Sequence, residues 1–229
     1  MNPHLLIVGA GSGLSASLSR VFSAAGYHVS LAARDTEKLN GVRDELDALC
    51  FKCDATSSDE VNSLFQSLEE SGRSPDVMIY NAGYYTRGAI NELQPEEVQQ
   101  SLAANAYGAF LCAHQASKRM ISQQRGVMLF TGASAGMKGF ANSAPFAMGK
   151  FALRGLCQSL SRELGPQNIH VVHAVLDGLI FSKERGAPYD NPDKTMMPEA
   201  IAKAYLAMAQ QERSAWTYEI ELRPWIESF

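Results

Sequence analysis

The fold of this chain depends on one stretch, Val8-Gly9-Ala10-Gly11-Ser12-Gly13-Leu14-Ser15. A short apolar run precedes it, and apolar residues at helical spacing follow it through residue 25. Glycines between a strand and a helix let the chain turn tightly. They also let a pyrophosphate approach the backbone, where the amino-terminal end of the helix stabilises negative charge. The stretch therefore predicts a dinucleotide-binding turn, although ordinary strand-to-helix turns also contain glycine.

Short apolar runs alternate with longer amphipathic segments along the rest of the chain. Strands are expected at residues 5–8, 29–33, 48–53, 77–80, 127–131, 170–176 and 218–222. Two long apolar helices are expected at 95–123 and 145–164, on the sheet face opposite the helices near 14–25 and 61–68. This alternation is typical of a doubly wound parallel sheet. The sequence predicts one α/β, Rossmann-like domain over residues 1–229, with about seven strands and helices on both faces.

Composition excludes several classes of function. The 229 residues suit one domain with a full-sized core. The formal net charge of −4 argues against a nucleic-acid-binding surface, which needs a clustered basic face. No apolar run is long enough to span a membrane. The N-terminal segment lacks the basic and long apolar regions of a signal peptide, so a cytoplasmic location is expected.

The chain has one cysteine pair at C-x-x-C spacing, Cys50 and Cys53. Residues three apart on a strand point to opposite faces, and no second Cys/His pair lies nearby. We therefore interpret them as small buried side chains of a strand and expect no metal site.

The end of the second expected strand indicates the type of dinucleotide. Arg34 offers a charge-assisted fork to a 2′-phosphate, whereas a carboxylate there would bind the ribose hydroxyls of NAD. Asp35 precedes a helical segment and is interpreted as a helix N-cap. Arg34 therefore favours NADP(H) over NAD(H), unless it is only a solvated surface residue.

Several motifs occur in the order that the short-chain dehydrogenase/reductase family has them, and the resemblance covers essentially the whole chain. Gly9-x-x-x-Gly13-x-Ser15 resembles the family's cofactor fingerprint, with serine in place of the third glycine. Asp54 is similar to the residue that contacts adenine, and Asn81-Ala82-Gly83 matches the family's Asn-Ala-Gly turn. Asn105 stands at the position of the family's structural and proton-relay asparagine. The resemblance implies a cofactor-binding set of Gly9, Gly11, Ser12, Gly13, Leu14, Arg34, Asp54, Asn81, Ala82, Gly83, Lys150, Gly178 and Ser182.

The catalytic set of the family is Asn, Ser, Tyr and Lys, and this chain departs from it at two positions. Lys150 matches the lysine that binds the nicotinamide ribose and lowers the pKa of the tyrosine. Phe146 stands at the tyrosine position, four residues earlier, and Ala133 at the serine position. Both hydroxyls that would contact the reacting oxygen are therefore absent from these positions.

Other side chains are candidates for the missing proton donor. Tyr84 and Tyr85 follow the Asn-Ala-Gly turn and are expected near the pocket mouth, where each also suits a role as pocket wall. Ser143 precedes Phe146 by about one turn and also suits a helix cap. The other candidates are Ser134, Asp177 and Lys150 itself. Asp177 replaces the family's proline, and Ser182 takes the place of the threonine that binds the carboxamide.

Three functions remain open. The favoured one is an NADP(H)-dependent oxidoreductase with a non-standard proton donor, acting on a small carbonyl, enone or imine, or on the matching alcohol. The second is an inactive dinucleotide-binding sensor or scaffold. The third is a lyase or isomerase in which the dinucleotide is structural.

The irregular segment 181–197 follows a strand and is expected to form a substrate lid over the carboxyl ends of the strands. The resemblance also implies a homodimer or homotetramer that pairs the two long helices. Phe151, Leu153, Leu156, Cys157 and Leu160 give the second of these helices a broader apolar surface than one core-facing stripe requires.

Overall fold

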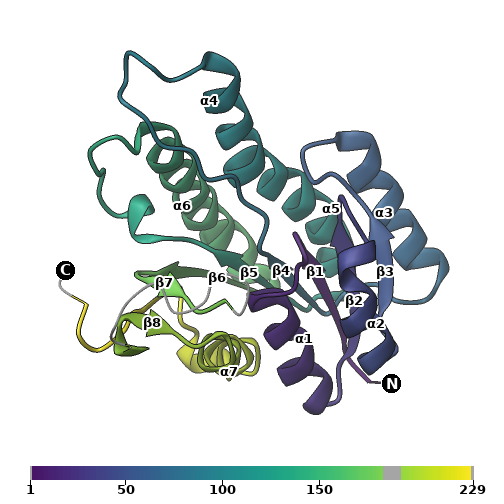
Figure 1. Ribbon diagram of the computed structural model, residues 1–229. Helices are drawn as coiled ribbons and strands as arrows, with labels where there is room; N and C mark the ends of the chain where they lie inside the picture. Colours follow the sequence, from purple (N-terminus) through teal and green to yellow (C-terminus); the bar gives the residue numbers. More distant parts are fainter. Residues whose placement is uncertain (1, 183–191, 228–229) are drawn as a thin grey trace.

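Seven parallel strands form the central sheet, in the order β3-β2-β1-β4-β5-β6-β9 (Figure 1). The computed structural model describes residues 2–182 and 192–227. The strands are β1 (His4–Val8), β2 (His28–Ala33), β3 (Leu49–Lys52), β4 (Val77–Tyr80), β5 (Gly126–Thr131), β6 (Ile169–Leu176) and β9 (Glu219–Leu222). Each expected strand is present, and the doubly wound parallel sheet is confirmed.

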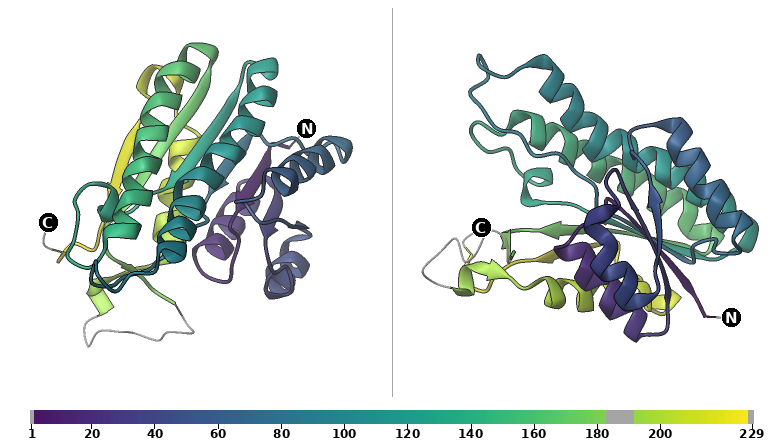
Figure 2. Two further views of the ribbon diagram at one scale, coloured as in Figure 1. Left: turned by 90° about the horizontal axis from the view of Figure 1, so that it is seen from above. Right: turned by 45° about the vertical axis from the view of Figure 1, so that its right-hand side comes forward.

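Helices cover both faces of this sheet (Figures 1 and 2). One face carries α1 (Leu14–Ala24), α2 (Asn40–Leu46) and α7 (Pro198–Ala209). The other carries α3 (Ser58–Glu70), α5 (Gly108–Gln123) and α6 (Ala144–Leu164), and α4 (Pro95–Leu102) packs against α6. Alternate residues of β1 separate the two cores: Leu6 and Val8 face α3 and α5, whereas Leu5 and Ile7 face α1. Full burial on both faces explains why the central strands β1 and β4 are almost continuously apolar.

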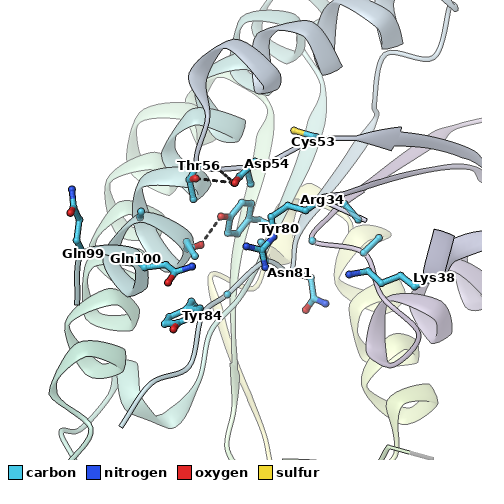
Figure 3. Close-up of a pocket in the computed structure, with 18 of the residues that line it drawn as sticks. Arg34, Lys38, Cys53, Asp54, Thr56, Tyr80, Asn81, Tyr84, Gln99 and Gln100 are labelled. Carbon is cyan, nitrogen blue, oxygen red and sulfur yellow. Dashed lines mark hydrogen bonds between the residues drawn. The ribbon is translucent and has the colours of Figure 1, made fainter. Parts of the chain in front are cut away.

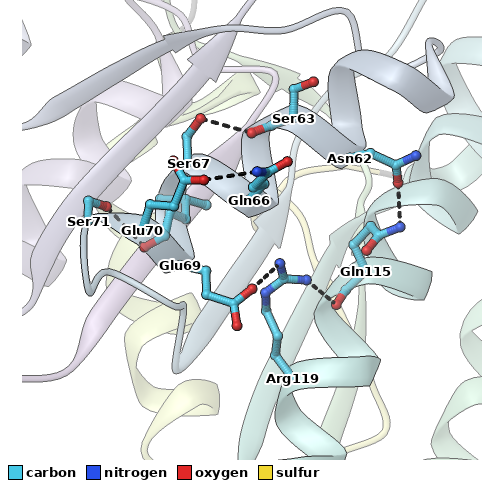
Figure 4. Close-up of polar contacts among 10 residues, drawn as sticks. Asn62, Ser63, Gln66, Ser67, Glu69, Glu70, Ser71, Gln115 and Arg119 are labelled. Carbon is cyan, nitrogen blue, oxygen red and sulfur yellow. Dashed lines mark hydrogen bonds and ion pairs between the residues drawn. The ribbon is translucent and has the colours of Figure 1, made fainter.

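The expectation that the helix near 61–68 lies opposite the two long helices is wrong. Arg119 of α5 donates a hydrogen bond of 2.8 Å to Glu69 of α3, and Gln115 bonds to Asn62 (Figure 4). The physical reason is topological. The first two crossovers run outward from β1 to β3, and the next returns past β1 to β4. A right-handed crossover that reverses direction places its helix on the opposite face.

The two long helices differ in regularity. The segment expected as one helix over 95–123 is interrupted by a π-helical turn, Ala103–Tyr107, between α4 and α5. The helix expected over 145–164 is continuous as α6. Short 3₁₀ helices occupy Glu37–Leu39, Ser134–Gly136, Gly165–Gln167, Pro192–Lys194 and Arg213–Ala215.

Part of the segment expected to be irregular contains regular structure. The strands β7 (Leu179–Ile180) and β8 (Thr195–Met196) pair in parallel as a second, small sheet. Residues 183–191 of the expected lid, 181–197, lie outside the described residues. Within residues 2–182 and 192–227, no helix combines the length and the apolar character needed to cross a bilayer.

Candidate active site

A cavity of about 470 Å³ opens at the carboxyl ends of the strands (Figure 3). It lies where β1 is flanked by β2 on one side and β4 on the other, the position at which the strand order reverses and where open α/β sheets bind ligands. Its lining residues are Gly9, Ala10, Ala33, Arg34, Lys38, Cys53, Asp54, Ala55, Thr56, Tyr80, Asn81, Ala82, Gly83, Tyr84, Glu96, Gln99, Gln100, Ala103 and Ala104.

The glycines of the turn after β1 serve two different purposes. Gly9 has a φ of +81°, and a Cβ added to it would lie 2.3 Å from the backbone nitrogen of Ala82. The packing of the protein itself therefore requires glycine at this position. A Cβ at Gly11 or Gly13 would meet nothing within 4 Å. These two glycines leave the backbone open at the beginning of α1, whose first turn contains no acidic residue. This arrangement fits a pyrophosphate group.

Hydrogen bonds join this turn to the end of β4. The Asn81 amide donates to the Ser15 hydroxyl at 2.9 Å, and that hydroxyl donates to the Gly9 carbonyl at 3.3 Å. The amides of Gly9 and Ala10 both donate to the Ala32 carbonyl, at 2.9 and 3.0 Å. The turn is thus fixed to both neighbouring strands, with Ser15 as the link to Asn81.

Two cationic side chains line the cavity beyond the end of β2. Arg34 is exposed there, and Lys38, in the 3₁₀ helix that follows, lies on the same side of the cavity (Figure 3). Asp35 does not line the cavity. Its carboxylate accepts a hydrogen bond from the Glu37 amide at 3.0 Å, but the N-cap of the 3₁₀ helix is Thr36, so the interpretation of Asp35 as the helix N-cap is wrong by one residue. Sequence reasoning missed Lys38, although its position one turn after Arg34 was a usable signal.

Asp54 lines the cavity after β3. Its carboxylate accepts hydrogen bonds from the amide and the hydroxyl of Thr56, at 2.9 and 2.8 Å. Burial alone would raise the pKa of Asp54, but these hydrogen bonds and the Arg34 charge outweigh it and lower the pKa. The carboxylate therefore stays ionised and fixed in orientation. Thr56 was not anticipated from the sequence. Cys53, also in the lining, is a buried free thiol, and the described residues contain no cluster suited to a metal ion.

Lys150 is 5% exposed and lies on α6. Its Nζ donates a hydrogen bond of 2.8 Å to the Thr131 carbonyl and lies 5.6 Å from the centroid of the Phe146 ring. Burial lowers the pKa of Lys150 to about 8. The side chain is therefore mostly a cation at neutral pH, with the Phe146 ring as a neighbour.

Asn105 lies in the π-helical turn, a local irregularity that is frequent at functional sites. Its amide donates to the Tyr84 carbonyl at 2.8 Å and to the Ser101 carbonyl at 3.0 Å. Its Oδ1 is buried without a hydrogen-bond partner among the described residues. A Cβ on Gly83 would lie 3.0 Å from this oxygen and 3.8 Å from the Lys150 Nζ. Gly83, which lines the cavity, therefore lies close to both an acceptor and a cation.

The structure separates the candidate proton donors. The Tyr85 ring packs on Phe146 in a T-shaped pair, with centroids 4.9 Å apart, and is 61% exposed. Tyr84 lines the cavity (Figure 3). Ser143 is buried and occupies the N-cap position of α6, as its interpretation as a helix cap requires, but its side chain makes no capping hydrogen bond. Ser134 opens a 3₁₀ helix directly after the extended residue Ala133.

The residues after β6 lie apart from the cavity lining. Asp177 is 7% exposed, and its carboxylate is 3.9 Å from the Arg223 guanidinium. Gly178 has a φ of +144°, and a Cβ there would lie 2.7 Å from the Pro224 side chain. Several predicted cofactor residues are not among the residues that line the cavity; they are Gly11, Ser12, Gly13, Leu14, Lys150, Gly178 and Ser182.

Residues 3–182 match the short chain dehydrogenase family. The chain belongs to this family. It is 28% identical over 165 residues to the 3-oxoacyl-[acyl-carrier-protein] reductase MabA of Mycobacterium tuberculosis, covering 72% of this chain and 64% of that reductase. A short-chain dehydrogenase structure from Rhodopseudomonas palustris is 30% identical, with a TM-score of 0.84, covering 98% of this chain and all of that one. A metagenomic short-chain oxidoreductase in complex with NADP is 24% identical, with the same TM-score and 98% coverage of both chains.

Proposed function

We propose that this short-chain dehydrogenase is an NADP(H)-dependent oxidoreductase with a non-standard proton donor, acting on a small carbonyl, enone or imine, or on the matching alcohol. The observation that carries the proposal is the placement of Lys150. Its buried ammonium group and the unpaired Asn105 oxygen both lie close to Gly83, which lines the cavity together with Gly9 and Ala10 of the glycine turn. Family members that keep this lysine use it to hold the nicotinamide ribose.

NADP(H) fits the residues present. The open backbone at Gly11 and Gly13 suits the pyrophosphate, and Arg34 with Lys38 suits the 2′-phosphate. Asp54, with its lowered pKa, suits a hydrogen bond from the adenine amino group. The NADP complex of the similar metagenomic oxidoreductase supports the same choice. When bound, the cofactor supplies or accepts a hydride.

The proposed reaction requires a group that donates a proton to the reacting oxygen. By resemblance, Phe146 and Ala133 take the positions of the family's tyrosine and serine. A general acid is worth roughly 10²–10⁴ in rate, and an oxyanion donor roughly 10²–10³. A neutral ketone that gains a hydride would therefore react slowly unless another group supplies these interactions. Tyr85 is the best placed substitute, because its ring contacts Phe146 directly. The Lys150 ammonium is the other.

The electrophile can also remove the need for a donor. A carbonyl oxygen that receives the electron pair becomes an alkoxide and needs a proton. A protonated imine carries its positive charge before the reaction and becomes a neutral amine after it. An imine is therefore the substrate class that tolerates the change to Phe146 and Ala133 best, followed by an enone, whose negative charge is delocalised.

A dinucleotide-binding protein without turnover is the second candidate. It is favoured by one observation: Phe146 and Ala133 carry no hydroxyl, whereas Arg34, Asp54 and Asn81 still line the cavity. In that case Lys150 serves only to hold the ribose.

The experiment that separates these candidates measures NADPH binding and then NADPH oxidation with matched substrates. Suitable substrates are cyclopentanone, 2-cyclopentenone and 2-methyl-1-pyrroline, together with an aryl set of 1-indanone and 3,4-dihydroisoquinoline. We expect NADPH binding, and faster oxidation with the imines than with the ketones. Phe146→Tyr combined with Ala133→Ser should raise ketone reduction by at least about 100-fold. Tight NADPH binding without turnover, unchanged in the double variant, would establish the non-catalytic alternative.

We also propose that the protein is a homodimer or homotetramer. Large hydrophobic side chains are exposed along α5, α6 and the turn that precedes α5; they are Tyr107, Phe110, Ile121, Met148 and Phe151. Exposed apolar side chains of this size are costly in contact with water, and their number on these helices supports an association surface there. Light scattering at micromolar concentration tests the proposal, and Phe110→Glu with Phe151→Glu should shift the protein to a smaller species.

A further inference from the structure

A buried polar network connects the strands β6 and β9 with the helix α6 that packs on them. His173 Nδ1 is 2.8 Å from the Glu219 carboxylate, to which the Arg154 guanidinium donates two hydrogen bonds of 2.8 Å. His173 is fully buried, and the Arg154 and Glu219 side chains are 26% and 20% exposed. Burial lowers the pKa of His173 against the effect of Glu219, so the ring is neutral at pH 7. The carboxylate acceptor then fixes the proton on Nδ1.

The other nitrogen of this ring faces the segment directly after β5. His173 Nε2 has no hydrogen-bond partner among the described residues. A Cβ added to Gly132 would lie 2.3 Å from Nε2, so the imidazole packs directly beneath the Gly132 backbone. The preceding residue, Thr131, supplies the carbonyl that accepts the hydrogen bond from Lys150. The chain of contacts therefore runs from Arg154 through Glu219 and His173 to the peptide that orients Lys150.

The chain of contacts begins and ends on the same helix, because Arg154 and Lys150 both lie on α6, four residues apart. Residues four apart on a helix share a face. One of them reaches the Thr131 carbonyl directly, and the other reaches the same peptide through Glu219 and His173. A rotation or shift of α6 relative to the sheet would break both connections together.

We propose that His173, held by Glu219 and Arg154, is a positioning residue for Lys150. Its ring packs against the peptide between Thr131 and Gly132 and keeps that peptide in place. The position of the Thr131 carbonyl in turn fixes the position and direction of the Lys150 ammonium group. This inference rests on the proposed function, in which Lys150 holds the nicotinamide ribose. The network has no counterpart in the sequence motifs, because its members lie on three elements.

The charges around Lys150 determine how removing the Glu219 charge changes the protonation of Lys150. Arg154 and the Cys157 thiol lie on the same helix, His173 on β6, Glu219 on β9, and the Tyr205 hydroxyl of α7 bonds to Thr131. Among these groups Glu219 is the anion that balances the Arg154 cation. Its loss leaves an unbalanced cation one helical turn from Lys150, which disfavours the ammonium form.

The test is Glu219→Gln, which keeps the shape of the side chain and removes its charge. NADPH affinity is measured by fluorescence titration from pH 6 to pH 10, with folding checked by circular dichroism. We expect about tenfold weaker binding at pH 7. We also expect the pH at which affinity falls to drop by about one unit. His173→Asn keeps a partner for Glu219 but withdraws the ring from Gly132. It should weaken binding with little change in that pH. If Glu219→Gln does not fold, Arg154→Lys tests the affinity arm alone: it keeps the ion pair, loses the two-bond contact with Glu219, and should weaken binding by a smaller factor without changing that pH.

Glu45→Gln is the matched control, because Arg20 and Glu45 form a similar two-bond ion pair on the surface. It should leave both readouts at wild-type values. Folded Glu219→Gln and His173→Asn proteins with wild-type NADPH affinity and pH dependence would overturn the positioning role and leave the proposed function intact. Absence of NADPH binding by the wild type would instead overturn the proposed function, and the positioning role with it.

Discussion

Gly9 and Ala82 bring the turn after β1 into direct contact with the segment after β4: a Cβ on Gly9 would lie 2.3 Å from the Ala82 nitrogen. Gly11, two residues later, would place a Cβ in open space. The same substitution at the two positions therefore tests two different properties, the stability of the fold and the access of a dinucleotide to the backbone.

Gly9→Ala should destabilise the protein by at least about 2 kcal/mol, because it combines a left-handed φ with a clash against backbone. Gly11→Ala should leave the free energy of unfolding within about 0.5 kcal/mol of wild type. It should weaken NADPH binding at least about tenfold by occupying the space of the pyrophosphate. Urea unfolding and NADPH titration of both variants check this. A stable Gly9→Ala protein would contradict the described contact.

The architecture followed from the sequence because each element carries its own local signal. Apolar runs predicted all seven strands of the main sheet. The face occupied by α3 was not predictable from its own residues, since it depends on where β4 inserts in the sheet. The short pair β7 and β8 was missed because two-residue strands have no periodicity.

The candidate site was predictable from the sequence where the functional groups lie within one short segment of the chain. The glycine turn, Arg34 and Asn81 belong to this class, and Lys38 needed only one further helical turn. The His173 network was not predictable. His173 and Glu219 are 46 positions apart, and neither residue type is unusual in its own segment. Only the pairing of β6 with β9 brings them together.

The end of β2 should determine the choice between NADPH and NADH. Arg34→Ala should weaken NADPH binding by about 10–100-fold, because a charge-assisted fork to a phosphate is lost. NADH binding should change by less than about threefold, since NADH has no phosphate there. Lys38→Ala should act in the same direction with a smaller effect, because lysine makes no bidentate contact. Lys52→Ala is the control, as Lys52 is an exposed cation that does not line the cavity. Equal losses for both cofactors in Arg34→Ala would show that Arg34 does not bind the 2′-phosphate.

Lys150 should make NADPH binding depend on pH. Its pKa is lowered to about 8 by burial, so the ammonium form dominates at pH 7 and disappears as the pH rises through 8. NADPH affinity of the wild type should therefore fall between pH 7 and pH 9. Lys150→Met should bind NADPH more weakly at pH 7 and show no further loss over this range. Isothermal titration calorimetry at pH 7 and pH 9 measures both effects. A wild-type affinity that is constant over this range would mean that the Lys150 charge does not contribute to binding.

His4 should make the stability of the protein depend on pH. It lies at the beginning of β1, at the end of the sheet opposite the cavity. Its ring is buried and 3.0 Å from the Ser30 hydroxyl. Burial, with the charges of Arg73 and His28, lowers the pKa of His4 to about 4. The unfolded chain binds a proton below about pH 6.5, and the folded state does not until about pH 4. The contribution of His4 is thus present at pH 7 and is lost as the pH falls toward 4.

Between pH 7 and pH 5 this single group should cost about 2 kcal/mol of the free energy of unfolding. His4→Gln keeps a polar partner for Ser30 and cannot be protonated, so the variant should lose less stability than wild type over the same range. His114→Gln, at an exposed position on α5, should retain the wild-type pH dependence. Urea unfolding at pH 7, 6 and 5 measures the three proteins. If His4→Gln and wild type lose equal stability on acidification, His4 is already protonated in the folded protein or is accessible to water there.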